Sequence, residues 1–212
     1  MTITSEDDID TIYHLSPKTE SLEIKVRTSD IDLAPLSNLK YLERLEIIDS
    51  GIKYLDLSPL SKCIRLIKLK INEDNLYDID ISSLKYHPYI DYIDIRGKLL
   101  KDIDINNLSS SIMMKSMNIS NTRIKHIDLE VVTHMAHLTN ICLSNNRISD
   151  IDLSPLSNCH QLKRFDISGN PLKKLDLFPL SHNDELSDVS IENTRIEDFD
   201  LSSLHIDRGF KF

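Results

Sequence analysis

Eight aspartates recur at a constant spacing of 24 residues and are the most regular chemical feature of the chain. They are Asp32, Asp56, Asp80, Asp104, Asp128, Asp152, Asp176 and Asp200. Each stands between two apolar residues, so its side chain is expected to point outward where its neighbours point inward. The eight carboxylates would then form a row, the Asp ladder. They account for nearly all of the net charge of −9, because the other 26 of the 34 acidic residues almost balance the 25 basic ones.

Carboxylates in such a row can accept hydrogen bonds from the nearby backbone or bind cations. An Asp two residues before a Ser accepts the Ser backbone N–H in an Asx-type turn, and in the segment DLSPL we expect Ser58 to cap a short helical turn that begins at Pro59. We favour this structural role and assign neither metal nor cofactor. The alternative is a cation-binding structural solenoid that holds Ca²⁺ between repeats. It would use a second acid two residues upstream, at Asp78, Asp102, Asp150 and Asp198.

Histidines cluster once, at His134 and His137, with His160 one repeat later. Such a group could recruit Zn²⁺, but no fourth ligand is evident, and we interpret these residues as surface polar groups. The same repeat replaces SPL with EVV at Glu130 to Val132, and the loss of proline there favours a longer true helix.

The chain has three cysteines, Cys63, Cys142 and Cys159. Cys63 and Cys159 lie four repeats apart, about 20 Å by the spacing of strands. Cys142 is expected on the opposite face. A disulfide needs Cα atoms within ~7 Å, so we predict three free thiols, which suit a reducing compartment.

Composition excludes several classes of function. No Ser, His and Asp side chains can be argued to converge, so we do not expect an enzyme. Only four glycines occur, which argues against a Gly-rich phosphate loop, and the acidic net charge argues against a nucleic-acid partner. No apolar run approaches ~18 residues, and the N-terminus MTITSEDDID does not resemble a signal peptide. We therefore expect no membrane association and a cytoplasmic location.

The elements that position these residues follow from the 24-residue period. Seven full repeats start at Leu42, Leu66, Ile90, Met114, Leu138, Leu162 and Leu186, after an incomplete unit that is one residue shorter. Repeat positions 1, 4, 6, 11, 14, 16 and 19 are apolar in all seven. Apolar positions 4 and 6 alternate with mostly polar positions 3, 5 and 7, which is typical of a half-buried strand. One unit cannot bury its own apolar face, so the units must stack and form a parallel sheet.

The segments LTNICLSNNRI (138–148) and LKRFDISGNPL (162–172) resemble the leucine-rich repeat, and the return arm ISDIDLSPLSN (148–158) resembles that of internalin-type repeats. The resemblance implies a repeat solenoid, a right-handed superhelix with a parallel β-sheet on the concave side. Turns and short 3₁₀ segments would occupy the convex side. The family's loop asparagine at position 9 survives only as Asn146 and Asn170, and we expect the loop at Lys98 to be the least regular.

These boundaries divide the chain into three parts. Residues 1–20 are expected to form an N-terminal cap, 21–204 the solenoid, and 205–212 a short C-terminal cap that carries Phe210 and Phe212. We expect a monomer, with a dimer through the C-terminal end as the alternative.

The same resemblance makes the concave face the expected binding surface. Its aromatic and charged positions gather in the first three full repeats, and aromatic and Arg residues dominate binding energy at interfaces. We predict that a protein partner, a segment bearing acid, binds there. The predicted residues are Arg44, Glu46, Ile48, Lys68, Lys70, Tyr92, Asp94 and Arg96. The favoured function is thus a non-enzymatic interaction scaffold; the alternative is a surface or host-directed adhesion module.

Overall fold

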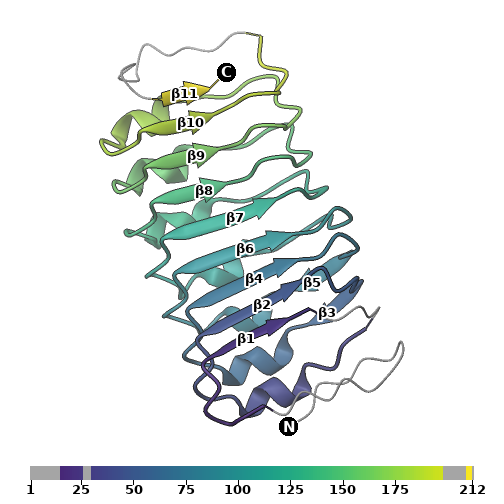
Figure 1. The fold of residues 1–212 in the computed structure, drawn as a ribbon. Helices are drawn as coiled ribbons and strands as arrows, with labels where there is room; N and C mark the ends of the chain where they lie inside the picture. Colours follow the sequence, from purple (N-terminus) through teal and green to yellow (C-terminus); the bar gives the residue numbers. More distant parts are fainter. Residues whose placement is uncertain (1–14, 26–29, 198–208, 212) are drawn as a thin grey trace.

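The computed structural model describes residues 15–25, 30–197 and 209–211, and these form a stack of parallel strands (Figure 1). Nine strands make one sheet in the order β1-β2-β4-β6-β7-β8-β9-β10-β11. Their bounds are β1 Ser21–Ile24, β2 Arg44–Ile48, β4 Lys68–Asn72, β6 Tyr92–Arg96, β7 Ser116–Ser120, β8 Asn140–Cys142, β9 Arg164–Asp166, β10 Asp188–Ser190 and β11 Gly209–Lys211. The predicted solenoid with a parallel sheet is therefore confirmed.

The register of the sheet follows the repeat. Leu69 pairs with Ile93, and Ile93 with Met117, so each residue lies beside its counterpart 24 positions away. Ser21 pairs with Arg44, an offset of 23, because the first unit is one residue shorter. Identical repeat positions therefore form straight columns across the sheet, and any side chain in the sheet can be placed from its position number alone.

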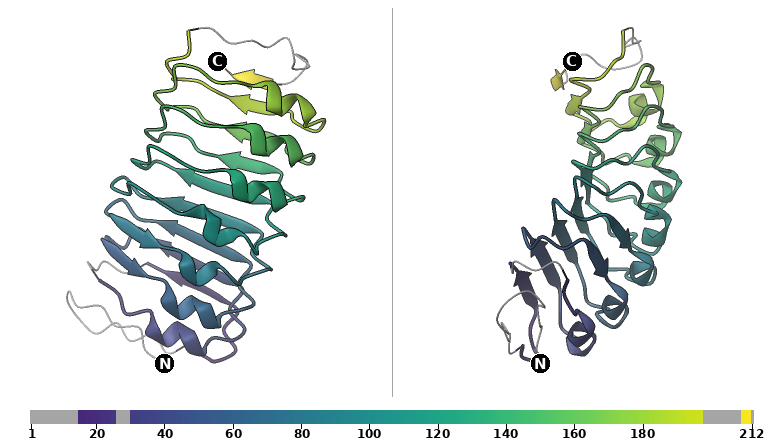
Figure 2. Two further views of the ribbon diagram at one scale, coloured as in Figure 1. Left: turned by 180° about the vertical axis from the view of Figure 1, so that it is seen from behind. Right: turned by 90° about the vertical axis from the view of Figure 1, so that its right-hand side faces the viewer.

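The face behind the sheet consists of 3₁₀ turns, which lie on the outer side of a gentle curve (Figure 2). They are η1 Ala34–Asn38, η2 Ser58–Lys62, η3 Ser82–Leu84, η4 Ile105–Leu108, η5 Glu130–His134, η6 Ser154–Asn158 and η7 Phe178–His182. Two short strands that the repeat pattern did not indicate, β3 (Tyr54–Asp56) and β5 (Asp78–Asp80), pair in parallel and add a small second sheet near the N-terminal end.

Apolar side chains from every described repeat form one continuous core between the sheet and the 3₁₀ turns. In the repeat that starts at Leu42, all seven apolar positions are buried, and Leu45 and Ile47 are fully so. Burial of one such side chain contributes roughly 1.5–3 kcal/mol, and it occurs only when the next repeat covers it. Position 14 is less well covered further along, since Ile127, Ile151 and Leu175 are only partly buried.

The chain leaves most strands through a residue with positive φ at position 8. Asp49, Asn121, Asn145 and Asn193 adopt φ values of 52–56° there, as Gly169 does at 68°. Asn, Asp and Gly tolerate this conformation best. Glu73 and Gly97 occupy position 8 without positive φ, and both loops close instead through a four-residue turn, in which Leu76 N donates to the Glu73 carbonyl and Leu100 N to the Gly97 carbonyl. The irregularity expected at Lys98 is thus shared by the preceding loop.

Two loop asparagines link neighbouring repeats as the family resemblance implied. The Nδ2 of Asn146 donates to the carbonyls of Ile119 and Leu143, and its Oδ1 accepts from Thr122 N at 3.0 Å. Nearer the N-terminus the carboxylate of Glu73, which is 0% exposed, takes over this task and accepts from the backbone N–H groups of Ser50 and Gly51. This role of Glu73 was not predicted, because a charged residue is rarely fully buried.

Two local predictions were wrong. The segment that begins at Glu130 forms η5, a 3₁₀ turn of five residues like its neighbours, and not a longer helix, because the fixed 24-residue spacing leaves no room for extra turns. Ser58 is the first residue of η2 and Leu57 is its N-cap, so Ser58 does not cap the turn. Within the described residues, no helix has the length and apolar character needed to cross a membrane.

The ends are described only in part. Residues 209–211, in the predicted C-terminal cap, form β11, and Phe210 pairs with Val189 of β10. The remainder of that cap, residues 205–208 and Phe212, lies outside the described residues, as do residues 1–14 of the predicted N-terminal cap and Asp198 and Asp200.

Candidate binding surface

The eight residues predicted to bind a partner lie together on three adjacent strands, and we call this group the concave patch. Position 3 contributes Arg44, Lys68 and Tyr92, which are direct neighbours across β2, β4 and β6. Positions 5 and 7 form two further rows beside them, with Glu46, Lys70 and Asp94 in one and Ile48 and Arg96 at the ends of the other. Four cations and two carboxylates leave the patch with a net charge of +2.

One half of the concave patch is organised by Glu46. Its carboxylate accepts a hydrogen bond from Lys68 Nζ at 2.8 Å and lies 3.5 Å from Lys70 Nζ. The hydrogen bond from Lys68 is the main reason why the pKa of Glu46 is lowered from its ordinary value. Lys68 Nζ also lies 5.0 Å from the centroid of the Tyr92 ring, within reach of a cation–π interaction that links the two halves.

Asp94 organises the other half and is only 1% exposed. Its carboxylate accepts from Arg96 Nε at 2.8 Å and Nη2 at 3.1 Å, from the Tyr92 hydroxyl at 3.3 Å and from Asn118 Nδ2 at 3.0 Å. The hydrogen bond to Asp94 raises the pKa of Arg96. Partial burial raises the pKa of Tyr92, and the Asp94 charge adds to this effect. Tyr92 and Arg96 are therefore held in place before any partner arrives.

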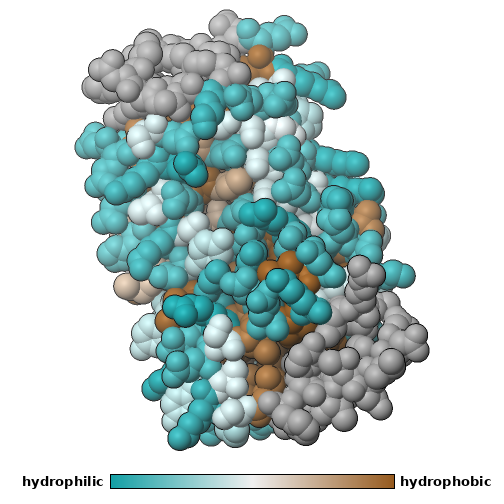
Figure 3. Space-filling view, viewed as in Figure 1, coloured by the Kyte–Doolittle hydropathy of each residue, from teal (hydrophilic) through white to brown (hydrophobic). Residues whose placement is uncertain are grey.

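Two of the eight predicted residues, Asp94 and Ile48, are almost completely buried. Tyr92, Arg96 and Asn118 surround the Asp94 carboxylate, which leaves no free oxygen for a partner. Ile48 is only 9% exposed, and Ser120 and Ser144 are buried at the same repeat position, whereas Asn72 and Arg96 there are partly exposed. The accessible groups of the patch are consequently its four cations, the Tyr92 ring and the carboxylate of Glu46, which is 25% exposed and paired with Lys68. Hydrophilic side chains cover most of the strand face, and hydrophobic ones surface mainly near the N-terminal strands (Figure 3).

The Asp ladder lies on the exposed convex side and makes the hydrogen bond expected from the sequence. In all seven described members one carboxylate oxygen accepts the backbone N–H two residues later, at 2.7–3.1 Å. Hydrogen bonds from Ser82 and Ser154 lower the pKa values of Asp80 and Asp152. The upstream acids Asp78 and Asp102 each accept the N–H of the next residue.

Metal-binding geometry is absent from the part of the chain that the structure describes: no three His, Cys, Asp or Glu side chains lie close enough together to hold an ion. His134 instead contacts Thr133 Oγ1 at 2.6 Å, and His160 contacts the carbonyl of His182 at 3.4 Å. These observations give no support to the Ca²⁺ and Zn²⁺ hypotheses.

The three cysteines are free thiols, as predicted, and two of them belong to a buried row at repeat position 22. Cys63 donates to the carbonyl of Leu36 at 3.3 Å, and burial raises its pKa to about 11. Cys159 is equivalent, with a pKa of about 11. His87 and Asn183 occupy the same position and contact carbonyls of the preceding repeat at 2.9 Å. The hydrogen-bonding role of this position was not predicted, because its residues share no single chemical type along the sequence.

Sequence comparison matches two family descriptions. Residues 10–131 match a BspA type leucine rich repeat region, and residues 113–172 match a leucine rich repeat. No curated protein matches the chain significantly.

Among solved structures, three are instructive. An internalin F from Listeria monocytogenes is 24% identical, with a TM-score of 0.64, over 92% of this chain and 62% of its own length. Internalin C2 from the same bacterium is 20% identical, with a TM-score of 0.71, over 91% of this chain and 79% of its own length. A plant peptide hormone receptor in complex with RGF2 is 16% identical, with a TM-score of 0.67, over 76% of this chain and 26% of its own length. The chain thus spans less than two thirds of internalin F.

Proposed function

Because the chain belongs to the leucine-rich repeat family, whose members are generally protein-interaction modules, we propose that it is a non-enzymatic scaffold that binds an acidic segment of a partner protein at the concave patch. The observation that carries this proposal is the arrangement of the patch itself. Arg44 is exposed and makes no ion pair with any described residue, and it stands in one row with Lys68 and Tyr92. An acidic segment could meet these three side chains together.

Two physical properties support binding at this place. The network around Glu46 and Asp94 fixes the side chains of Lys68, Tyr92 and Arg96, so less side-chain entropy is lost on binding. The patch also carries a net charge of +2 in a protein whose net charge is −9, which would steer a negatively charged partner toward it.

The proposal is tested by affinity purification from the native cell lysate, with mass spectrometry. The binding variant is Arg44→Ala with Tyr92→Ala, because these changes leave the hydrogen bonds between Arg96 and Asp94 intact. The matched control is Ser116→Ala with Arg164→Ala, two residues at the same repeat position on β7 and β9. We expect a partner that the wild type and the control recover and the binding variant does not. Equal recovery by all three would refute the proposal.

We further propose a cytoplasmic location, which the three free thiols support because such compartments keep cysteines reduced.

A further inference from the structure

A second exposed surface lies on the flank of the solenoid, where each 3₁₀ turn leads into the next strand. Large apolar side chains are exposed there: Tyr41 at 44%, Ile64 at 61%, Tyr89 at 59% and Met113 at 42%. All occupy positions 23 and 24 of the repeat. In later repeats the same positions hold Ala136 and His137, His160 and Gln161, and Asp184 and Glu185. The apolar character is therefore confined to the N-terminal half and does not follow from the repeat pattern.

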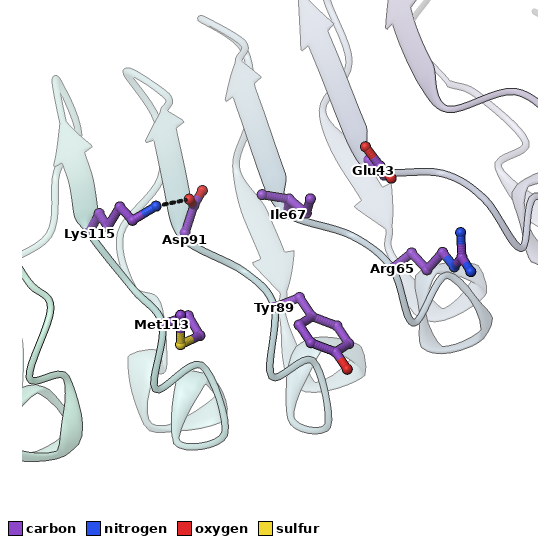
Figure 4. A pocket seen from close by; sticks show the side chains of 7 residues that line it. All are labelled: Glu43, Arg65, Ile67, Tyr89, Asp91, Met113 and Lys115. Carbon is purple, nitrogen blue, oxygen red and sulfur yellow. Dashed lines mark hydrogen bonds and ion pairs between the residues drawn. The ribbon is translucent and has the colours of Figure 1, made fainter.

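Two open hollows run along this part of the flank and meet at Arg65. One has a volume of about 310 Å³ and an apolar wall of Ile67, Tyr89 and Met113 (Figure 4). The ion pair of Lys115 with Asp91, 2.9 Å long, stands on its rim, where the strands begin. The other hollow, of about 560 Å³, has Tyr41 and Ile64 as its apolar wall. We call the two hollows together the flank groove.

The second hollow is also basic. Its charged lining residues are Lys40, Lys62 and Arg65, with no carboxylate among the residues that line it. None of these three cations forms an ion pair with a residue in the described ranges. The guanidinium of Arg65 instead lies 5.0 Å from the centroid of the Tyr41 ring, which holds the charge at the junction of the two hollows. The second hollow therefore places positive charge beside exposed apolar surface in a protein with a net charge of −9.

We propose that the flank groove is a second interaction site, which takes a short acidic segment of a protein that carries one aromatic or aliphatic anchor residue. The anchor would occupy the hollow beside Tyr89 and Met113, and the acidic residues would pair with Lys40, Lys62 and Arg65. A flat anionic membrane fits less well, because the first hollow has no net charge: its two acids, Glu43 and Asp91, are balanced by its two bases, Arg65 and Lys115. The site lies on a different face from the concave patch, so it does not depend on the function proposed for that patch.

Selection of a displayed random peptide library on the whole protein tests this inference. We expect enrichment of peptides that combine Asp or Glu with Phe, Trp, Leu or Ile. The groove variant is Lys40→Glu with Arg65→Glu, and its affinity for the enriched peptides, measured by fluorescence anisotropy, should fall at least about tenfold. The matched control is His160→Glu with Gln161→Glu, at the same two repeat positions in a distant repeat, and it should bind as the wild type does. The four replaced residues, Lys40, Arg65, His160 and Gln161, are all exposed, so both variants should fold, and thermal melting checks this.

Several results would overturn the inference. These are a selection without enrichment, enriched peptides that lack acids, and peptides that bind the groove variant as tightly as the wild type. If the concave variant, Arg44→Ala with Tyr92→Ala, no longer binds these peptides, their binding site is the concave patch instead. Binding to phosphatidylserine-containing vesicles that only the groove variant loses, without peptide enrichment, would identify a membrane site. A concentration-dependent dimer in the wild type that the groove variant abolishes would identify a second copy of the chain as the occupant.

Discussion

The replacement Asp94→Asn should destabilise the protein and loosen the concave patch. Asn has nearly the same volume as Asp but no charge, and it offers one acceptor oxygen where Asp94 offers two. The bonds at Oδ1, from Arg96 Nε and Asn118 Nδ2, can persist in weaker form. Those at Oδ2, from Arg96 Nη2 and the Tyr92 hydroxyl, would be lost, since an amide nitrogen cannot accept them.

The expected loss in the free energy of unfolding is about 2 kcal/mol. A hydrogen bond to a charged group contributes roughly 1.5–3 kcal/mol when it is buried. Arg96 reduces this figure, because its side chain is 39% exposed and water can solvate the freed guanidinium. Asn118 acts in the opposite direction: its Oδ1 is already buried without a partner in the described structure, so a weakened bond at Nδ2 leaves the amide poorly satisfied.

Urea unfolding followed by circular dichroism measures this loss, and a double-mutant cycle with Arg96→Met isolates the pair. The coupling energy between the two replacements should be at least about 1 kcal/mol. Asp166→Asn is the matched control at the same repeat position. Asp166 uses one oxygen for both of its bonds to Ser168, and its other oxygen accepts only from the weak thiol donor of Cys142 at 3.7 Å, so the loss should be less than about 0.5 kcal/mol. If Asp94→Asn costs no more than Asp166→Asn, the assignment of Asp94 as the organiser of the patch is wrong.

Three further predictions concern the frame of the solenoid. Burial lowers the pKa of His87 below its ordinary value of 6.5, so the unfolded chain binds a proton more readily than the folded one. The contribution of His87 to stability should therefore be full above pH 6.5 and fall as the pH drops below that value. In the variant His87→Gln, the urea concentration at the unfolding midpoint should change less between about pH 5 and 7 than it does in the wild type. Glu73→Ala leaves the N–H groups of Ser50 and Gly51 unsatisfied and should lower the free energy of unfolding, measured with urea, by about 2–4 kcal/mol. A loss as small as that of replacing an exposed Glu by Ala would contradict the role of Glu73. Asp56→Ala should lower the melting temperature by about 2–4 °C, and Asp56→Asn should lower it by less, because Asn keeps the acceptor for Ser58 N. Millimolar Ca²⁺ should not shift the melting temperature of any of the three proteins, whereas a rise that is largest in the wild type would establish the cation hypothesis.

The sequence predicted the arrangement of the sheet well because the fold is nearly one-dimensional. In a stack, the position of a residue within its repeat fixes its column, as the pairing of Leu69, Ile93 and Met117 shows. The shortened first unit was likewise visible in the sequence and reappears as the 23-residue offset between Ser21 and Arg44. The concave patch could be located for the same reason.

What the sequence did not reveal depends on contacts between different repeat positions. Asp94 is buried because Tyr92 and Arg96 on its own strand, and Asn118 on the next, converge on it, and a rule of alternation cannot show this. Glu73 takes the role that an asparagine at position 9 has in other repeats, but it stands at position 8. A comparison of the residues at position 9 therefore does not find it. The flank groove did leave a signal in the sequence, since Ile64 and Tyr89 are apolar at positions that hold only polar residues from His137 to Glu185.

Hydroxyl-radical footprinting of the protein with its recovered partner tests the central claim, that binding occurs on the concave patch, most directly. Labelling of Tyr92 should fall when the partner binds, whereas labelling of Phe178, which is exposed on η7 of the convex side, should not change. Unchanged labelling of Tyr92 together with protection of Phe178 would contradict the account.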